Sequence, residues 1–270
     1  MTTPRYISAA LATLALAACV SQDQETQIGQ SQAAQVSAQL PMLDDPAITG
    51  YVDSLGKSIA AKTTRADLKW QFAVVNTDVV NAFALPGGYI FVNRGLIAHT
   101  QNESELAAVL GHEIEHVVER HGVQQMEKAE GANIGIALAC RLTNICSHRA
   151  AQVAIQIGGA AAFARFGRKD EVRADSGGFR NEVRAGLNPN GMLTFFQQLM
   201  ASEKRTPALF AWFTDHPGTQ DRVADVKRWL AQESPSVLNT LRTDSPAFQS
   251  MKQHLAQLPP APPPPADTTR

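Results

Sequence analysis

The sequence His112-Glu113-Ile114-Glu115-His116 lies inside a stretch with the apolar periodicity of a helix. The apolar positions and the polar start at Asn102 predict one helix over residues 103–121. Because four residues make about one helical turn, both imidazoles project from the same face and can bind one metal ion. Glu113 lies beside them, where its carboxylate can accept the proton of an attacking water. The apolar residues that carry the periodicity are Leu106, Val109, Leu110 and Val117.

Two histidines leave a catalytic zinc site one protein ligand short. The metzincin continuation, a Gly and a third His at fixed offsets, is missing, so that class is excluded. His121 is out of register with His116, and we interpret it as a helix-capping residue or a hydrogen-bond partner of a ligand. Glu171 and Asp175 are four residues apart on another predicted helix. Glu171 can therefore bind the metal while Asp175 accepts the other ring N–H of a ligating histidine.

These motifs resemble those of the Ste24/HtpX-like zinc metallopeptidases over about residues 40–232. The resemblance rests on Asn81 to Gly88 (NAFALPGG), the two motifs above, and His216-Pro217 followed by Arg222. It implies a mainly helical zincin-like α+β domain with a small β-sheet or hairpin, and one zinc ion per chain. The implied roles are His112, His116 and Glu171 as zinc ligands, Glu113 as a catalytic residue, and Asp175 as the group that orients His112.

Two positions of the second motif depart from the family pattern. Members often have an acidic residue before its Ala-Asp pair and an Arg after it, whereas this chain has Arg173 and Ser176. Neither change removes a ligand. Gly177 and Gly178 follow directly and are expected to weaken the helix, because glycine disfavours a helix interior by up to about 1 kcal/mol relative to Ala.

His216 has two functional interpretations. It is a catalytic residue that stabilises the oxyanion formed during attack, or it is a fourth ligand that displaces water and keeps the enzyme latent, as the resemblance suggests. A plain loop residue is the third option. Arg222 either assists near the site or lies on a helix surface.

The N-terminus has the layout of a lipoprotein signal peptide over residues 1–18. Leu16-Ala17-Ala18-Cys19 resembles a bacterial lipobox, which predicts lipidation of Cys19 and a membrane anchor. A plain secreted protein is the alternative. Val20, in place of an Asp, favours an outer-membrane lipoprotein that faces the periplasm. Of the three cysteines, Cys140 and Cys146 remain as a possible disulfide, which would require a helix to end between them.

The organisation predicted for the mature chain is one domain with two flanking segments. Residues 19–40 form the lipidated N-terminus with a polar tether or a loosely packed leading helix, and residues 41–245 form the metallopeptidase domain. Residues 246–270 form a Pro-rich tail. A helix over 46–62 and short strands at 68–74, 82–85 and 89–92 precede the later helices, which is the order of an α+β fold. The apolar stretch 150–166 is expected to be a core helix.

Charge and hydropathy exclude two classes of protein. The 24 basic and 25 acidic side chains give a net charge of −1, so the electrostatic signature of nucleic-acid binding is missing. No run approaches the roughly 20 apolar residues of a membrane-spanning helix. We therefore predict a zinc metalloendopeptidase of the cell envelope, acting on misfolded or unassembled envelope and outer-membrane proteins. Outer-membrane assembly machinery is a candidate partner. The alternative is a lipoprotein chaperone or assembly factor with a latent or structural zinc site.

Overall fold

The computed structural model describes residues 20–128, 166–202, 212 and 215–262. Its strands come early and its later elements are all helices, which confirms the predicted α+β class with a small sheet. The elements are α1 (Gln22–Gln39), α2 (Pro46–Ala60), β1 (Gln71–Val75), β2 (Ala82–Leu85), β3 (Tyr89–Asn93), α3 (Arg94–His99), α4 (Glu103–Val118), α7 (Arg168–Arg184), α8 (Asn190–Ser202), α10 (Thr219–Gln232), α11 (Pro235–Leu238) and α12 (Pro246–Gln257).

The three strands form one mixed sheet in the order β1-β3-β2. β1 runs parallel to β3, and β2 runs antiparallel to β3 through the turn Pro86-Gly87-Gly88. Both glycines have positive φ, 79° and 100°, a conformation that residues with a Cβ rarely adopt. Phe72 and Ile90 face the main core, whereas Phe91 faces the opposite side of the sheet. β2 is an edge strand on this arrangement.

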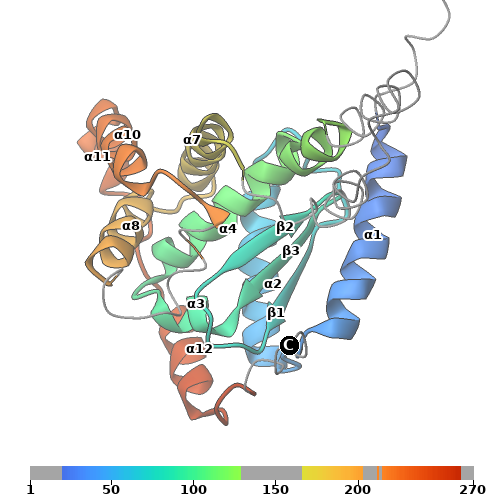
Figure 1. Ribbon diagram of the computed structural model, residues 1–270. Helices are drawn as coiled ribbons and strands as arrows, with labels where there is room; N and C mark the ends of the chain where they lie inside the picture. Colours follow the sequence, from blue (N-terminus) through green and yellow to red (C-terminus); the bar gives the residue numbers. More distant parts are fainter. Residues whose placement is uncertain (1–19, 129–165, 203–211, 213–214, 263–270) are drawn as a thin grey trace, which may run out of the picture.

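Helix α4 is the central helix of the domain, and every residue from Glu103 to Val117 is buried. Its first turn is capped by Asn102, whose side-chain oxygen accepts the Glu105 N–H at 3.1 Å. The helix ends at Val118, earlier than the predicted 121, and Arg120 then turns the chain with a φ of 57°. Helices α2, α7 and α8 and strand β2 all pack against α4 (Figure 1).

The motif that contains Glu171 and Asp175 lies on α7, and it reaches α4 because the two helices pack very closely. A Cβ at Gly178 would lie 2.9 Å from the carbonyl carbon of Gly111, and one at Gly177 would lie 2.2 Å from the Glu115 carboxyl group. Helix α7 continues through both glycines. The two glycines therefore matter mainly because they permit a close contact between α7 and α4. This contact brings Glu171 and Asp175 to the histidine pair.

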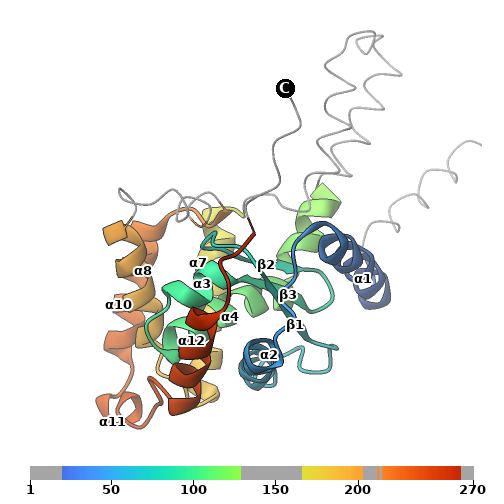
Figure 2. The ribbon, with the colours of Figure 1, turned by 90° about the horizontal axis from the view of Figure 1, so that it is seen from below.

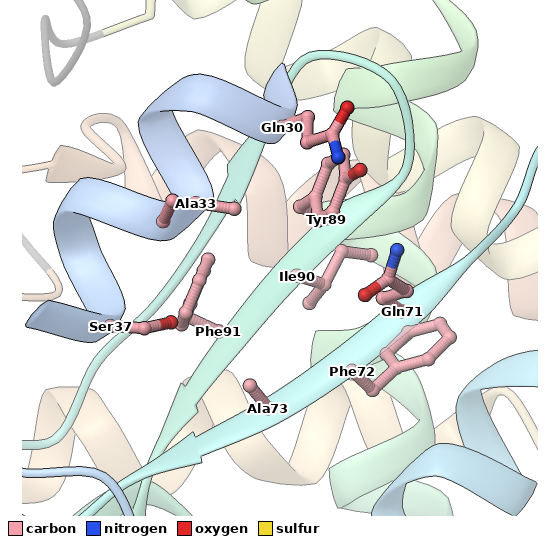
Figure 3. Close-up of a pocket in the computed structure, with 10 residues that line it drawn as sticks. Gln30, Ala33, Ser37, Gln71, Phe72, Ala73, Tyr89, Ile90 and Phe91 are labelled. Carbon is pink, nitrogen blue, oxygen red and sulfur yellow. The ribbon is translucent and has the colours of Figure 1, made fainter. Parts of the chain in front are cut away.

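Residues 22–39 are a packed helix and not a polar tether, so the structure selects the second interpretation of this segment. Ala33 and Val36 of α1 pack against the sheet face that carries Phe91. Gly29 permits the contact, since a Cβ there would overlap the carbonyl oxygen of Pro86 at 1.8 Å. Figure 3 shows α1 across this face, beside a depression of about 290 Å³ that Gln30, Ala33, Ser37, Tyr89 and Phe91 help to line.

The predicted domain end at residue 245 is too early. Helix α12 begins at Pro246, and Phe248, Met251 and Leu255 are buried in the main core. Arg94 donates hydrogen bonds to the carbonyl oxygens of Leu255 and Leu258, at 3.3 and 3.2 Å. The spacing of these apolar residues is that of a helix, but the prolines that follow obscured it. In Figure 2, α8, α10 and α12 lie on one side of α4 and α1 lies beyond the sheet.

Several predictions concern residues outside the described ranges. These are Cys19, the Cys140 and Cys146 pair, nearly all of the apolar stretch 150–166, and the tail beyond 262. Within residues 20–128, 166–202 and 215–262, no helix combines the length and the apolar character needed to cross a membrane.

Candidate metal centre

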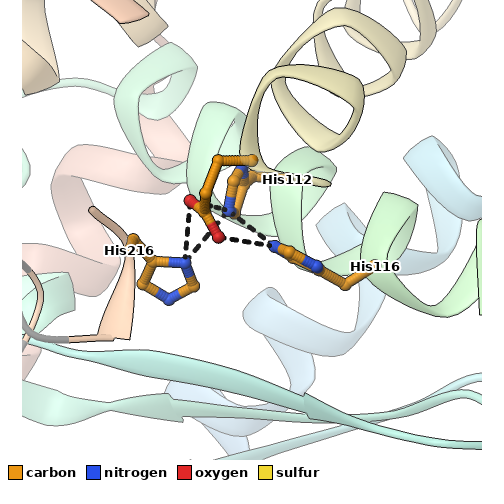
Figure 4. Close-up of side chains that lie close together, drawn as sticks. His112, His116 and His216 are labelled. Carbon is orange, nitrogen blue, oxygen red and sulfur yellow. Dashed lines mark hydrogen bonds and ion pairs between the residues drawn. The ribbon is translucent and has the colours of Figure 1, made fainter. Parts of the chain in front are cut away.

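Four buried side chains converge at the middle of the molecule: His112 and His116 from α4, Glu171 from α7, and His216 from the segment before α10. Their ligand atoms all lie within 4.8 Å of one another. Nε2 of His112 is 3.0 Å from Nε2 of His116 and 3.2 Å from Nδ1 of His216. The Glu171 carboxylate lies 3.5 Å from both α4 histidines and 3.3 Å from His216 (Figure 4).

The donor set fits a metal cation. Nδ1 of His112 lies 2.8 Å from Oδ1 of Asp175, which assigns the proton to Nδ1 and leaves a lone pair on Nε2. That lone pair faces two other ring nitrogens and a carboxylate. Among the residues that the structure describes, the only close cationic group at the Glu171 carboxylate is Arg222, whose Nη1 lies 2.9 Å from Oε2, and no group donates a well-aligned hydrogen bond to either oxygen. Converging lone pairs repel one another, and a cation bound between them removes that repulsion.

Two neighbouring groups hold the α4 histidines in place. Asp175 contacts His112 as predicted, and His121 contacts His116 through their Nδ1 atoms at 2.9 Å. The second contact agrees with the interpretation of His121 as a partner of a ligand. His216 is held by its backbone N–H, which donates to the Trp212 carbonyl at 2.8 Å.

Glu113 lies in the site without being one of the four clustered donors. Its side chain is fully buried, and its Oε1 is 3.5 Å from Nε2 of His216. Neither of its oxygens has a hydrogen-bond partner within the described ranges. Burial raises the pKa of Glu113, although the facing rings of His216 and His112 oppose the shift. No protein group in the described ranges occupies these oxygens, and in its ionised form a carboxylate with a raised pKa is a stronger base than an ordinary one.

The sequence of the chain matches peptidase family M48 over residues 46–230. The chain belongs to this family. It is 30% identical over 224 residues to the β-barrel assembly-enhancing protease of Escherichia coli K12, covering 80% of this chain and 46% of that protein. It is also 30% identical over 207 residues to the mitochondrial metalloendopeptidase OMA1 of Schizosaccharomyces pombe, covering 76% of this chain and 60% of that protein.

A third M48 relative is nearer in size. The metalloprotease LoiP of Escherichia coli K12 is 26% identical over 180 residues, which cover 67% of this chain and 68% of LoiP. The chain spans about half the length of the β-barrel assembly-enhancing proteases it matches. The structure thus brings together the residues that the M48 resemblance implied as ligands, and it places His216 among them.

Arg222 is the residue of this M48 site that the sequence left undecided. It is buried, so the helix-surface interpretation is wrong. Its guanidinium binds both oxygens of Asp175 at 2.6 and 2.7 Å, and its Nη1 lies 2.9 Å from Glu171. A second link joins the His216 segment to the NAFALPGG motif, since Asn81 donates to Asp215 at 2.8 Å. The contacts of Arg222 and the hydrogen bond between Asn81 and Asp215 each join segments that are far apart in the sequence.

For Glu171, Asp175 and His112, the interactions with neighbouring charges stabilise the ionised form by more than burial destabilises it. Burial opposes ionisation of Glu171, but His216 and Arg222 hold its pKa well below the usual range. Burial likewise opposes ionisation of Asp175, and the Arg222 charge lowers its pKa. In the metal-free protein, burial and Arg222 oppose protonation of His112, yet the carboxylates of Asp175 and Glu171 raise its pKa to about 9, so a metal ion that binds Nε2 must displace a proton from it. Both carboxylates therefore remain ionised, as a metal ligand and its supporting anion must be.

Two buried carboxyl groups near the centre were not predicted from the sequence. Glu182 lies seven residues after Asp175, on the face of α7 that meets α4, and burial raises its pKa well above the usual range. Glu115, inside the histidine motif, accepts a hydrogen bond from Asn181 at 2.5 Å. Burial raises the pKa of Glu115 to about 7. Their helical spacing from Asp175 and His112 was a usable signal for burial, but charged residues at such positions are usually solvated.

Proposed function

We propose that this M48 chain is a zinc metalloendopeptidase of the cell envelope that hydrolyses peptide bonds in misfolded or unassembled envelope proteins. The observation that carries this proposal is the buried donor set of His112, His116 and Glu171 with the carboxylate of Glu113 beside it, which has no hydrogen-bond partner among the described residues. A structural zinc site needs only the donors. The additional buried base, placed to meet a water at the same point, favours catalysis.

Each residue of the site has a definite task in peptide hydrolysis. His112, His116 and Glu171 would hold the zinc ion, which when bound polarises the scissile carbonyl and acidifies water. Glu113 takes the proton of the attacking water and delivers it to the leaving amine. Asp175 keeps the His112 ring in the binding tautomer. Arg222 keeps Asp175 and Glu171 ionised inside the protein.

Strand β2 is the proposed docking strand for substrate. The Asn93 N–H donates to the Asn81 carbonyl, so by the antiparallel alternation the backbone groups of Ala82 and Ala84 point away from β3. These groups lie on an edge that packs beside α4. An extended segment that adds along this edge would be recognised mainly through its backbone, which suits unfolded chains of varied sequence.

The proposed location is the periplasmic face of the outer membrane, with residues 1–18 removed and Cys19 lipidated. The Escherichia coli K12 relative is named for β-barrel assembly, which supports outer-membrane assembly machinery as a partner here. The alternative function, a lipoprotein chaperone or assembly factor with a latent or structural zinc site, lacks an observation of its own.

Metal removal and restoration test the proposed function. The purified protein should contain one zinc ion per chain by elemental mass spectrometry and should cleave an unfolded protein such as reduced casein. Treatment with 1,10-phenanthroline should abolish cleavage, and added zinc should restore it, because the base alone cannot polarise the carbonyl. Suppression of substrate aggregation with no cleavage by the zinc-loaded protein would instead support the chaperone alternative.

For His216, we propose the fourth-ligand interpretation, in which this residue keeps the enzyme latent. Its Nδ1 lies as close to His112 and Glu171 as a ligand atom of the same cluster would. His216→Ala is then expected to raise casein cleavage several-fold, because it frees a position for water. His254→Ala is the matched control, since His254 binds Asp45 far from the site and is 43% exposed. A lowered turnover would support the oxyanion interpretation, and an unchanged rate would contradict both.

A further inference from the structure

The start of helix α1 is clamped to the end of the domain that carries the metal centre. Only Val20 and Ser21 separate Cys19 from this helix. We propose that the clamp orients the domain on the bilayer, so that the surface around the C-terminal end of α4 and the loop 61–67 faces the lipid. The metal centre then lies near the membrane, where it meets unfolded chain at the bilayer surface. This inference rests on the proposed lipidation of Cys19.

The centre of the clamp is Glu25, in the first turn of α1. Its side chain is fully buried. The carboxylate binds Arg65 through two contacts of 2.8 and 3.1 Å, binds Nε of Arg120 at 2.9 Å, and accepts the Gly87 N–H at 3.3 Å. A buried carboxylate with these partners is costly to pull away, because its removal would leave two arginines without their counter-charge.

The clamp extends to the residue next to the proposed anchor. The backbone N–H of Val20 donates to Glu127 at 3.0 Å, and its carbonyl accepts a hydrogen bond from Arg120. Gln22 donates to Asp67 at 3.2 Å, which ties the same end of α1 to the loop 61–67. Fixing Val20 leaves one peptide unit, about 3.8 Å, between the held backbone and the Cα atom of Cys19. A lipid on Cys19 would therefore hold this surface against the bilayer.

The end of the domain that holds the start of α1 is also the end that carries the metal centre. Arg65 donates to the carbonyl of Val117, in the last turn of α4, at 2.9 Å. Arg120 directly precedes His121, which contacts the metal-site residue His116. Glu25 and His116 line the same small cavity. The charge cluster that receives the start of α1 thus includes Arg120, from the segment that follows the histidine motif, and Arg65, which contacts the last turn of α4.

The opposite end of the domain would face away from the bilayer. Helix α2 leads from Asp45, which binds His254 of α12 at 2.8 Å, to the loop 61–67. Its 15 residues span about 22 Å at 1.5 Å per residue. In Figure 1, α12 lies at the foot of the molecule, and α1 starts at the level of the end of α4 and runs down the right-hand side. Ala66 and Gln253 are exposed positions near these two ends.

Energy transfer to labelled lipid tests this orientation without relying on catalysis. The full chain, processed and acylated in bacteria, carries Cys140→Ser and Cys146→Ser with either Ala66→Cys or Gln253→Cys as the dye site. Each protein is reconstituted into phosphatidylethanolamine and phosphatidylglycerol vesicles that contain a headgroup-labelled acceptor lipid. Transfer from position 66 should exceed transfer from position 253 by roughly twofold or more, since about 22 Å of helix separates the two ends.

Two controls separate the clamp from the anchor. A 20-residue Gly-Ser insertion between Cys19 and Val20 leaves the clamp intact but frees it from the lipid, and it should bring the two positions to similar transfer. Glu25→Gln should reduce the difference in energy transfer between positions 66 and 253. Thermal unfolding should show that this variant is folded. Equal transfer from both positions of an uninserted chain that floats with vesicles would overturn the orientation. A chain that does not float would refute the lipid anchor itself, and the orientation with it, while leaving the proposed peptidase activity untouched.

Discussion

Glu113→Gln is expected to lower the cleavage rate of an unfolded protein by roughly 10²–10⁴-fold, the range for loss of a general base. The amide has the shape of the carboxylate but cannot take the proton of an attacking water. Because Glu113 is not one of the four clustered donors, zinc content should stay at the wild-type level. The measurement is the initial rate of casein cleavage, normalised to zinc determined on the same samples.

Glu115→Gln is the matched control for this experiment. Glu115 is two residues away in the same motif and is also buried, but its carboxyl group contacts Asn181 and packs against Gly177. Its amide analogue should retain most of the activity, since burial already raises the pKa of this group to about 7. Equal cleavage by wild type and Glu113→Gln at equal zinc content would show that Glu113 is not the base.

The predictable part of the site is the part set by helical spacing. His112 and His116 share a face because they are four residues apart, and Glu171 and Asp175 share one for the same reason. The sequence could not show that α7 lies on α4, because that contact depends on Gly177 and Gly178 meeting backbone and side chain across the interface. Arg222 could not be assigned either, since its burial follows from packing between segments far apart in the chain.

The fold shows the same division between local and distant causes. The helix expected at 46–62 is found at Pro46–Ala60, because the Asp45 cap and the apolar spacing are local signals. By contrast, the residues of helix α12 were predicted to belong to the Pro-rich tail. The residues of helix α1 were predicted to form either a tether or a helix. Both are stabilised by their contacts: Phe248 fills the main core, and Glu25 is buried against two arginines. Polar sequence around a few anchoring residues gives no local indication of such contacts.

Arg222→Leu is expected to destabilise the metal-free protein by about 3–5 kcal/mol, the cost of removing one partner of a buried ion pair. Arg222 is 1% exposed, and its single positive charge lies between two fully buried carboxylates, those of Asp175 and Glu171. Without it, burial would raise the pKa of both groups, or each would remain as an uncompensated charge. Urea unfolding of the metal-depleted protein, followed by circular dichroism, measures the difference in free energy of unfolding.

Arg228→Leu, on the same helix α10, is the control for Arg222→Leu. Its guanidinium pairs with Asp225 at 2.6 Å but is 59% exposed, so its loss should change stability by less than about 1 kcal/mol. Zinc should recover part of the loss in Arg222→Leu, because the ion would compensate the charge of Glu171 but would not contact Asp175. Similar losses in both variants would contradict this account of Arg222. A full recovery with zinc would show that Asp175 does not need the arginine, leaving Glu171 as the group that Arg222 stabilises.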